Sequence, residues 1–358
     1  MTLIIFLFIL GLLIIVHEFG HFIVAKKAGV KVEKFSLGFG RVILSREKNG
    51  TQYSLCAIPL GGYVKMAGDN IDEFKGKPEE YLAKPVRSRA AIVFAGPLLN
   101  YVLGFLCFWL IFFAGFPMLT AKVGGSLEGF GAQEAGIMKG DRIIRVDGKG
   151  IIYWEELQRA IAQKKDSSVI KVSVLREDKE FDVDVKVKET EQPDIFGQKH
   201  SVRVLGIRPA GEVLKVRHGF WQSAGLGLKE TWKLSGMTYK GLWLVITGRL
   251  PFKDSVTGPL GIFQLTSEAA QIGFTAIVHL IALLSVSLAI FNLLPFPVLD
   301  GGHILLLAVE KIRKKPLGMK SERLITQFGL TLIITLAVLV TFNDLVRFKD
   351  RILNFFIK

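Results

Sequence analysis

The sequence predicts a polytopic α-helical membrane protein with four spans and a soluble α+β domain inserted between the second and third. Half of its 358 residues are hydrophobic, and the mean hydropathy of +0.39 is too high for an ordinary soluble domain. The apolar residues gather into four long blocks that are almost free of charge, whereas a long segment between the second and third blocks carries many charges of both signs. This uneven distribution excludes a disordered chain, a collagen and a small disulfide-rich protein.

Each of the four apolar blocks is long enough to cross a membrane as a helix, which takes about 20 residues. Residues 3–25 are uncharged apart from Glu18, and residues 90–116 and 273–299 carry no charge at all. The last block, 324–342, adds 19 uncharged residues. We do not expect the first block to be a cleavable signal peptide, because its positive charges follow the apolar run and no small-x-small cleavage site is present.

The charges of the connecting segments predict how the chain crosses the membrane. Residues 26–89 hold 13 Lys and Arg against 7 Asp and Glu, and residues 303–323 hold 6 against 2. The long segment 117–272 is nearly balanced, and long loops cross regardless of charge. We therefore expect the two short segments inside, and both termini and the long segment outside. The net charge of +14 then reflects topology and anionic lipid headgroups, with no nucleic-acid partner.

Between the first two spans the sequence predicts a β-hairpin. Residues 41–48 and 51–58 have strand-like patterns, and they flank Asn49-Gly50, a strong signal for a tight hairpin turn. The run 58–66 is apolar and rich in glycine, so we expect it to touch the membrane.

Residues 121–190 predict a small mixed domain, with a helix over 154–163 and strands over 142–146, 169–175 and 181–187. The segment 219–249 is amphipathic, because its three tryptophans recur every eleven residues and three lysines lie on an adjoining face. These residues are Trp221, Trp232, Trp243, Lys229, Lys233 and Lys240. One interpretation is a core helix with a basic solvent side; the other, which we favour, is a helix in the lipid headgroup layer.

His17-Glu18-Phe19-Gly20-His21 has the pattern HExxH. On a helix, residues four apart share a face, so the two imidazoles can bind one Zn²⁺ while Glu18 acts as the general base. Two histidines and a glutamate near the end of a spanning helix are costly unless they are paired or bind a metal. A polar cluster that joins helices is the alternative to a zinc site.

A catalytic zinc takes a third protein ligand, for which we predict Asp300. It follows Asn292-Leu293-Leu294-Pro295-Phe296-Pro297, where two prolines break the third span, and non-helical backbone at membrane depth is tolerated only where it is buried or lines a cavity. Three other residues are weaker candidates for this position: Glu33, which lies in a basic loop, His303 and His279, the last being more typical of a polar contact inside a bundle.

HExxH in the first span, with Asn-x-x-Pro and LDG in the third, resembles the site-2 protease family of intramembrane zinc metalloproteases. The resemblance covers essentially the whole chain. It is similar to the bacterial branch, the regulator-of-sigma-E proteases that release membrane-bound anti-sigma factors, in a version with one PDZ domain. Further motifs that carry it are Phe39-Gly40, the run 58–66, Gly96-Pro97-Leu98-Leu99-Asn100, Ala135-Gly136-Ile137-Met138-Lys139-Gly140-Asp141 and Gly258-Pro259-Leu260-Gly261-Ile262.

The resemblance implies a membrane-reentrant β-hairpin and a PDZ fold for the inserted domain. The expected domains are a first membrane part, a PDZ domain, an amphipathic interfacial segment and a second membrane part, over residues 1–116, 117–210, 211–262 and 263–358. The expected location is the bacterial inner membrane, with the active site toward the cytoplasm and the PDZ domain outside. The expected partners are a transmembrane substrate, such as an anti-sigma factor, and membrane lipids.

Residues and resemblance predict the same reaction. His17, His21 and Asp300 would bind Zn²⁺, Glu18 would act as general base, and Asn292 would donate a hydrogen bond to the oxyanion or the substrate backbone, or cap the broken helix. An unwound substrate could add as a strand to the hairpin, along either 51–58 or 58–65. The expected substrate-binding residues are Tyr53, Leu55, Gly61, Gly62, Pro295 and Pro297.

Two other functions are compatible with parts of the sequence. A non-enzymatic membrane scaffold with a PDZ-like domain would explain the spans and leave His17, Glu18, His21 and Asp300 unexplained. A metal transporter would need polar residues in several spans, and the second and fourth are nearly bare. For 121–190 we expect a gate that excludes substrates with bulky outer domains; recruitment of substrate is the alternative.

Overall fold

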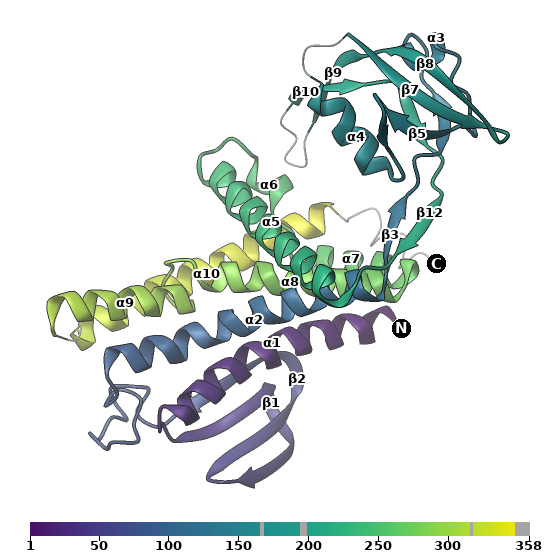
Figure 1. Cartoon of the computed structure of the whole chain (residues 1–358). Coiled ribbons are helices and arrows are strands. Elements are labelled where there is room, and N and C mark those ends of the chain that lie inside the picture. The colour runs from purple at the N-terminus through teal and green to yellow at the C-terminus, as the bar shows by residue number, and fades with distance from the viewer. Residues whose placement is uncertain (165–167, 194–198, 316–317, 348–358) are drawn as a thin grey trace, which may run out of the picture. The chain divides into compact units, whose positions relative to one another are not determined.

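Figure 1 shows the computed structural model, which describes residues 1–164, 168–193, 199–315 and 318–347. Lys358, the C-terminal residue that we expect outside the membrane, is not among these described residues. The chain divides into two compact units. Unit 1 consists of Met1–Ile111 and Phe220–Lys358, and unit 2 consists of Phe112–Gly219.

Unit 1 is helical apart from one β-hairpin. Four of its helices are long and apolar enough to cross a membrane, namely α1, α2, α8 and most of α10, so the prediction of four such helices is confirmed. The elements of unit 1 in chain order are α1 (Thr2–Lys27), β1 (Val32–Lys48), β2 (Thr51–Met66), α2 (Val86–Ala114, which continues into unit 2), α5 (Phe220–Ile246), α6 (Phe252–Ser255), α7 (Pro259–Ile272), α8 (Phe274–Asn292), α9 (Asp300–Arg313) and α10 (Met319–Arg347).

The third apolar block is helical over a shorter range than the uncharged residues 273–299. Helix α8 ends at Asn292, because Pro295 and Pro297 have no backbone N–H with which to continue the helix. The chain re-enters a helix at Asp300, where α9 begins. A segment expected only as a basic connection therefore contains a helix with the candidate ligand at its first residue.

The hairpin between α1 and α2 is longer and more folded than its turn motif predicts. The turn lies at Asn49 and Gly50, both with positive φ. The first half of β1 pairs on both sides, with residues 62–66 of β2 and with residues 52–55. Residues 51–56 also pair with 42–48 beyond the turn, so they lie inside the sheet. Within the described chain, 62–66 has one strand neighbour and forms an edge.

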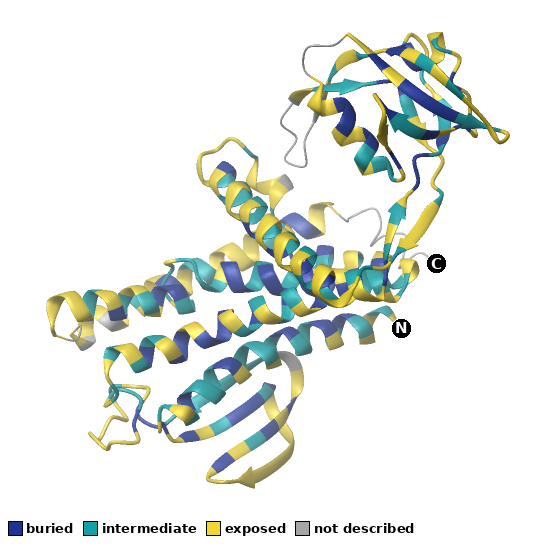
Figure 2. Ribbon diagram, in the orientation of Figure 1, coloured by how far each residue is buried: buried dark blue, intermediate teal, exposed yellow. Residues whose placement is uncertain are grey.

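Figure 2 shows that the half of the hairpin near its turn is exposed, while the half near α1 is partly buried. The buried half contributes Val32 to an apolar cluster with Ala25 in the last turn of α1, Val30 just after that helix, and Ile92 of α2. This cluster fixes the edge segment 62–66 against α1, because Val64 and Met66 pack on it.

Unit 2 has the α+β composition that the sequence predicts. Its helix α4 (Trp154–Gln163) and strands β5 (Arg142–Val146), β7 (Val169–Arg176) and β8 (Lys179–Lys186) match the expected elements closely. Together with β6 (Lys149–Gly150) these strands form a sheet in the order β6-β5-β7-β8. The other elements are β3 (Phe116–Leu119), β4 (Val123–Ser126), α3 (Gly131–Glu134), β9 (Lys188–Pro193), β10 (Lys199–Val204), β11 (Ile207–Pro209) and β12 (Val213–Val216).

The core of unit 2 is formed by the alternating apolar residues of this sheet and the inner face of α4, among them Ile143, Val172 and Leu157. Strands β3 and β12, at the two ends of the unit, pair with one another. The residues 211–216 therefore belong with unit 2, although the sequence placed them in the amphipathic segment that follows.

Helix α5 has one buried face and one exposed apolar face. Gly227 packs closely on the backbone of Trp109 in α2, and Thr231 and Ser235 are buried on the same face. Trp221, Trp232 and Trp243 are all exposed. The helix thus packs on the span bundle while its aromatic stripe faces outward.

Candidate metal centre

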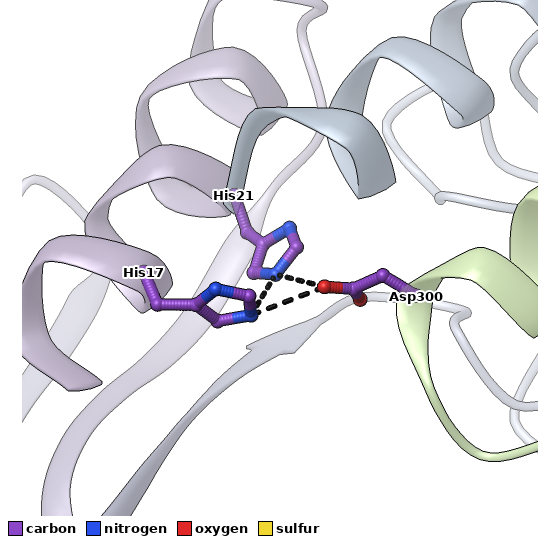
Figure 3. A group of neighbouring side chains, drawn as sticks. All are labelled: His17, His21 and Asp300. Carbon is purple, nitrogen blue, oxygen red and sulfur yellow. Dashed lines mark hydrogen bonds and ion pairs between the residues drawn. The ribbon is translucent and has the colours of Figure 1, made fainter. Parts of the chain in front are cut away.

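Three side chains that can bind a metal meet where α1 approaches the start of α9 (Figure 3). His17 and His21 lie one turn apart on α1, and Asp300 is the first residue of α9. Asp300 Oδ2 lies 3.1 Å from His17 Nε2 and 3.6 Å from His21 Nε2. The two Nε2 atoms are 3.2 Å apart. The sequence-predicted ligands are thus brought together from segments almost 280 residues apart.

The loop between α8 and α9 delivers Asp300 to this position. Val298 has a positive φ of 78°, which is unusual for a β-branched residue and turns the chain back toward α1. Gly301 and Gly302 follow the aspartate because side chains would not fit there. A Cβ at Gly302 would lie 2.7 Å from the carbonyl carbon of Phe296, and one at Gly301 would collide with the carbonyl oxygens of Leu293 and Leu294.

Glycines also allow α1 and α2 to approach one another closely at the site. A Cβ at Gly20 would lie 2.6 Å from the carbonyl carbon of Ala95. A Cβ at Gly96 would lie 2.6 Å from Cε1 of His21 and 2.9 Å from Cε1 of His17. Both imidazoles therefore occupy the space that a side chain at Gly96 would fill.

Helix α2 supplies a polar partner for the second ring nitrogen of each histidine. His21 Nδ1 lies 2.8 Å from the carbonyl oxygen of Ile92, and His17 Nδ1 lies 3.3 Å from the amide of Asn100. Ile92, Gly96 and Asn100 are spaced by four, so they share one face of α2. Asn100 ends the motif Gly96-Pro97-Leu98-Leu99-Asn100, which contributed to the family resemblance, but the sequence predicted no role for it.

The three side chains fit a zinc ion. Zinc prefers tetrahedral nitrogen and oxygen ligands at about 2.0–2.2 Å, which places ligand atoms roughly 3.3–3.5 Å apart, close to the three observed separations. The histidine side chains are 12% exposed and Asp300 17%. Asp300 Oδ2 is buried without a hydrogen-bond partner, and a bound metal ion would satisfy it instead. Among the described residues this is the one group of three such side chains close enough to share an ion.

Glu18 faces a cavity of about 440 Å³ beside the ligands. The edge of β2 forms one wall of this cavity, through Gly61, Gly62 and Val64, and the loop before α9 forms another. The backbone N–H of Val64 is directed at the Glu18 carboxylate. Asn292, the last residue of α8, also lines the cavity, and its amide nitrogen lies 3.5 Å from His17 Nε2.

The expected substrate-binding residues divide into two sets. Gly61 and Gly62 line the cavity beside Glu18. Tyr53 packs its ring against Phe22 and Phe35 inside the sheet, and Leu55 lies on the strand that is paired on both sides.

Neither Tyr53 nor Leu55 lines the cavity, and neither do Pro295 and Pro297. Pro297 instead lies against α10, where a Cβ at Gly329 would lie 3.0 Å from its carbonyl carbon.

Another cavity, of about 820 Å³, borders the centre on the side of His21 and Asp300. An ion pair between Arg89 of α2 and Glu310 of α9 lies in its wall, with Arg89 Nη1 3.1 Å from Glu310 Oε2. This ion pair joins α9, which carries Asp300, to α2, which supports both histidines.

Tyr81, in the loop before α2, also lines this cavity. Burial raises the pKa of Tyr81 to about 12, so its hydroxyl stays protonated and can donate a hydrogen bond.

The weaker ligand candidates lie away from the three ligand atoms. Glu33 forms an ion pair with Lys65, 3.6 Å away. His303 lines the larger cavity, and His279 packs edge-on against Phe108 between α8 and α2.

Comparison with known proteins gives a family match over most of the chain. The model of peptidase family M50 matches residues 5–336. Proteins of Agrobacterium fabrum and Rhizobium meliloti, each named as a candidate zinc metalloprotease, are both 32% identical over 95% of this chain and cover 94% and 95% of their own lengths. One of Campylobacter jejuni, named in the same way, is 33% identical over 95% of this chain and 92% of its own.

Two solved structures resemble part of the chain only. The PDZ domain of an SdrC-like protein from Listeria monocytogenes is 23% identical, covers 25% of this chain and 84% of its own, and has a TM-score of 0.20. A solution structure from Geobacillus thermodenitrificans is 25% identical, covers 20% of this chain and 82% of its own, and has a TM-score of 0.18.

Proposed function

The chain belongs to peptidase family M50, and on that premise we propose that it hydrolyses peptide bonds inside the transmembrane segments of single-span membrane proteins. It is a metalloprotease, its metal is zinc, and its apolar helices make it a membrane protein. The observation that carries the proposal is one cavity in which Glu18 faces both the histidines and an open strand edge. This site lies on segments long and apolar enough to be embedded in lipid.

His17, His21 and Asp300 would hold the zinc, which when bound acts as a Lewis acid toward water and the scissile carbonyl. Glu18 lies between the two histidines in sequence and faces the same cavity. Its carboxylate is placed to take a proton from the attacking water and to deliver it to the leaving amine nitrogen. Asn292 carries an amide at the cavity wall and is placed to donate to the developing oxyanion or to the substrate backbone.

The edge of β2 offers a way to hold the substrate. A transmembrane helix hides its peptide bonds and must unwind before it is cut, yet unpaired backbone groups are costly in lipid. An unwound segment could add as a strand along 62–66, whose outer side has no strand neighbour within the described residues, and thereby satisfy its own N–H and C=O groups. Of the two edges that the sequence left open, the position of this segment beside Glu18 supports the second.

The hairpin itself is a candidate for the reentrant element that the family resemblance implies. Its outer half exposes Phe39, Ile43 and Leu44, as well as Leu55 and Ile58, a set better suited to lipid than to water. Exposed tryptophans on α5 similarly support contact with the headgroup layer.

The relatives are bacterial proteins, which supports the inner membrane of a bacterium as the location. The basic short segments support an orientation with the hairpin turn inside and unit 2 outside. Cysteine labelling should therefore place Asn49 inside and Asp178 outside. The opposite result at Asn49 would reverse the proposed orientation.

For unit 2 we propose a PDZ fold that acts as a gate, so that substrates with bulky outer domains are excluded until they have been trimmed. An anti-sigma factor shortened by a first cleavage is the substrate class that this selection favours. Deleting residues 121–190 should then relax selection and allow untrimmed substrates to be cut. A general fall in cleavage of every substrate would instead support recruitment by unit 2.

Co-expression with candidate single-span membrane proteins tests the proposed reaction. Glu18→Gln should lower cleavage by about 100-fold or more, the range expected for a lost general base, while zinc content stays near wild type. Glu33→Gln is the matched control, because this carboxylate pairs with Lys65 instead, and it should cleave normally. Cleavage by Glu18→Gln at the wild-type rate would refute the role of Glu18.

Family membership makes a non-enzymatic scaffold a poor account of this chain. It also disfavours a metal transporter, and the polar side chains gathered at one centre add to that, because transport would require them along several spans.

A further inference from the structure

We propose that Asn100 is a positioning residue that selects the tautomer of His17 and thereby contributes to zinc affinity without touching the metal. The inference rests on the zinc centre proposed above and concerns how α2 holds its two histidines. The partners of the two imidazoles differ in kind. His21 faces a backbone carbonyl, whereas His17 faces a side-chain amide.

The partner of His21 permits one tautomer. The carbonyl oxygen of Ile92, 2.8 Å from Nδ1, can only accept a hydrogen bond. Nδ1 of His21 must therefore carry the hydrogen, which leaves a lone pair on Nε2. Because Nε2 is the atom directed at the metal position, His21 has the tautomer that zinc requires whether or not zinc is bound.

The partner of His17 permits either tautomer. An amide presents a donor and an acceptor of the same shape, and a half-turn about its terminal bond exchanges them. With Nδ2 of Asn100 directed at Nδ1 of His17, as found at 3.3 Å, the hydrogen of His17 resides on Nε2. There it can be donated to the lone pair on Nε2 of His21, 3.2 Å away, a favourable arrangement for a metal-free centre.

Zinc binding through Nε2 requires the other tautomer, with the hydrogen on Nδ1. The half-turn of the amide would then direct Oδ1 of Asn100 at Nδ1 of His17 to accept this hydrogen. Two observations support that state. Oδ1 of Asn100 is buried and has no hydrogen-bond partner. Asp300 Oδ2, 3.1 Å from His17 Nε2, is also buried without one, and it is the atom that would bind the ion beside that nitrogen.

The surroundings leave Asn100 few alternatives. The residue is 0% exposed, and its own backbone carbonyl accepts a hydrogen bond from the hydroxyl of Ser285 in α8, at 2.8 Å. Asn100 is thus held by α8 on its backbone and meets α1 through its side chain. Its place two turns after Ile92 on the same face of α2 aims the amide at His17.

Zinc affinity separates this role from a purely structural one. The full-length protein in detergent would be titrated against a chromogenic zinc chelator, as wild type, Asn100→Leu and Asn100→Asp. Loss of a hydrogen-bond partner behind a ligand typically costs 10- to 100-fold in metal affinity, so Asn100→Leu should lose at least about tenfold. Asn100→Asp keeps an acceptor opposite Nδ1 and should bind zinc within a few-fold of wild type.

Asn343→Leu provides a matched control. This amide is also buried in a spanning helix and hydrogen-bonds to a carbonyl, that of Lys253, and it should leave zinc affinity unchanged. His17→Ala must lose zinc whatever Asn100 does. Wild-type affinity in Asn100→Leu, or an equal loss in Asn100→Asp, would refute the role of Asn100. Unchanged affinity in His17→Ala would refute the ligand set itself.

Nitrogen NMR of histidine-labelled protein reads the tautomer directly and does not depend on activity. Metal-free wild type should show His17 with its hydrogen on Nε2, and zinc-loaded protein should show it on Nδ1. Asn100→Asp should show the Nδ1 form in both states, because a carboxylate only accepts. A His17 tautomer that does not respond to Asn100→Asp would overturn the proposal.

Discussion

A single methyl group at Gly96 should weaken zinc binding without unfolding the protein. In Gly96→Ala the new Cβ would lie 2.6 Å from Cε1 of His21 and 2.9 Å from Cε1 of His17, well inside the 3.4 Å at which ordinary contact begins. The imidazoles lie directly in its path, so the ligands must move. Overpacking of this kind costs roughly 1–3 kcal/mol.

If the two imidazole rings move and α1 and α2 do not, this free-energy cost appears as weaker zinc binding. At 1.4 kcal/mol for each factor of ten, zinc affinity should fall roughly 5- to 150-fold. The same substitution gains about 1 kcal/mol of helix propensity, which offsets part of the packing cost in the thermal stability of the metal-free protein. Affinity by chelator competition and the melting temperature in detergent should therefore change independently.

Two other glycines serve as controls for Gly96→Ala. Gly11 of α1 has no atom within 4 Å of an added Cβ, so Gly11→Ala should leave zinc affinity unchanged. Gly104 lies two turns further along α2, where a Cβ would meet Cγ2 of Val286 at 2.5 Å. Gly104→Ala should lower stability and spare zinc. Zinc affinity within twofold of wild type in Gly96→Ala, or an equal loss in Gly104→Ala, would refute the reasoning.

Three further outcomes follow from named contacts. Asp300→Asn should lower the zinc content measured by metal analysis, whereas Glu33→Gln should leave it full; the reverse pattern would reassign the third ligand. Burial alone would raise the pKa of Asp141, but hydrogen bonds from Arg176 and a backbone N–H outweigh it and hold the pKa below its usual value. Unit 2 should therefore lose stability as pH falls below about 4, and Asp141→Asn should reduce this dependence in hydrogen exchange of the full chain. Asp344→Leu should lower the melting temperature, because two backbone N–H groups at the start of α7 lose their acceptor at a cost of roughly 1–3 kcal/mol each; an unchanged melting temperature would contradict it.

The sequence predicts the apolar helices well because the signal for each is local. A run of about 20 uncharged residues specifies a helix in lipid without reference to the rest of the chain. The HExxH pattern is local in the same sense, since helical geometry alone places His17 and His21 on one face. Asp300 could be inferred across a long separation because a carboxylate after a proline-broken span is chemically unusual.

The pairing of the hairpin could not be inferred in the same way. The turn at Asn49 and Gly50 specifies one pairing, between the residues that flank it. The second pairing of β1, with 62–66, depends on how the sheet packs on α1 and Ile92, which is not encoded in any short pattern. For this reason the sequence left two candidate edges, and Tyr53 and Leu55 were assigned to the one that lies inside the sheet.

The role of α2 was missed for a different physical reason. The sequence marks reactive groups by their charge and by the cost of burying them, and the block 90–116 has no charge. What α2 supplies is instead a backbone carbonyl at Ile92, an absent side chain at Gly96 and a neutral amide at Asn100. None of these is costly to bury once partnered. Gly96 and Asn100 therefore entered only through a motif of the family resemblance, and they were assigned no role at the metal centre on physical grounds.

The metal centre should be sensitive to the packing of α1 on α2, because the ligands and the groups that orient them lie on different helices. The ligand atoms come from α1 and α9, but their orientation and the space they occupy depend on one face of α2. A small separation of the two helices would remove the acceptor from His21 and the amide from His17 together, since both contacts span the same interface. Zinc affinity should therefore report on the docking of these spans, and substitutions along this face of α2 should couple to one another more strongly than their separate effects on stability suggest.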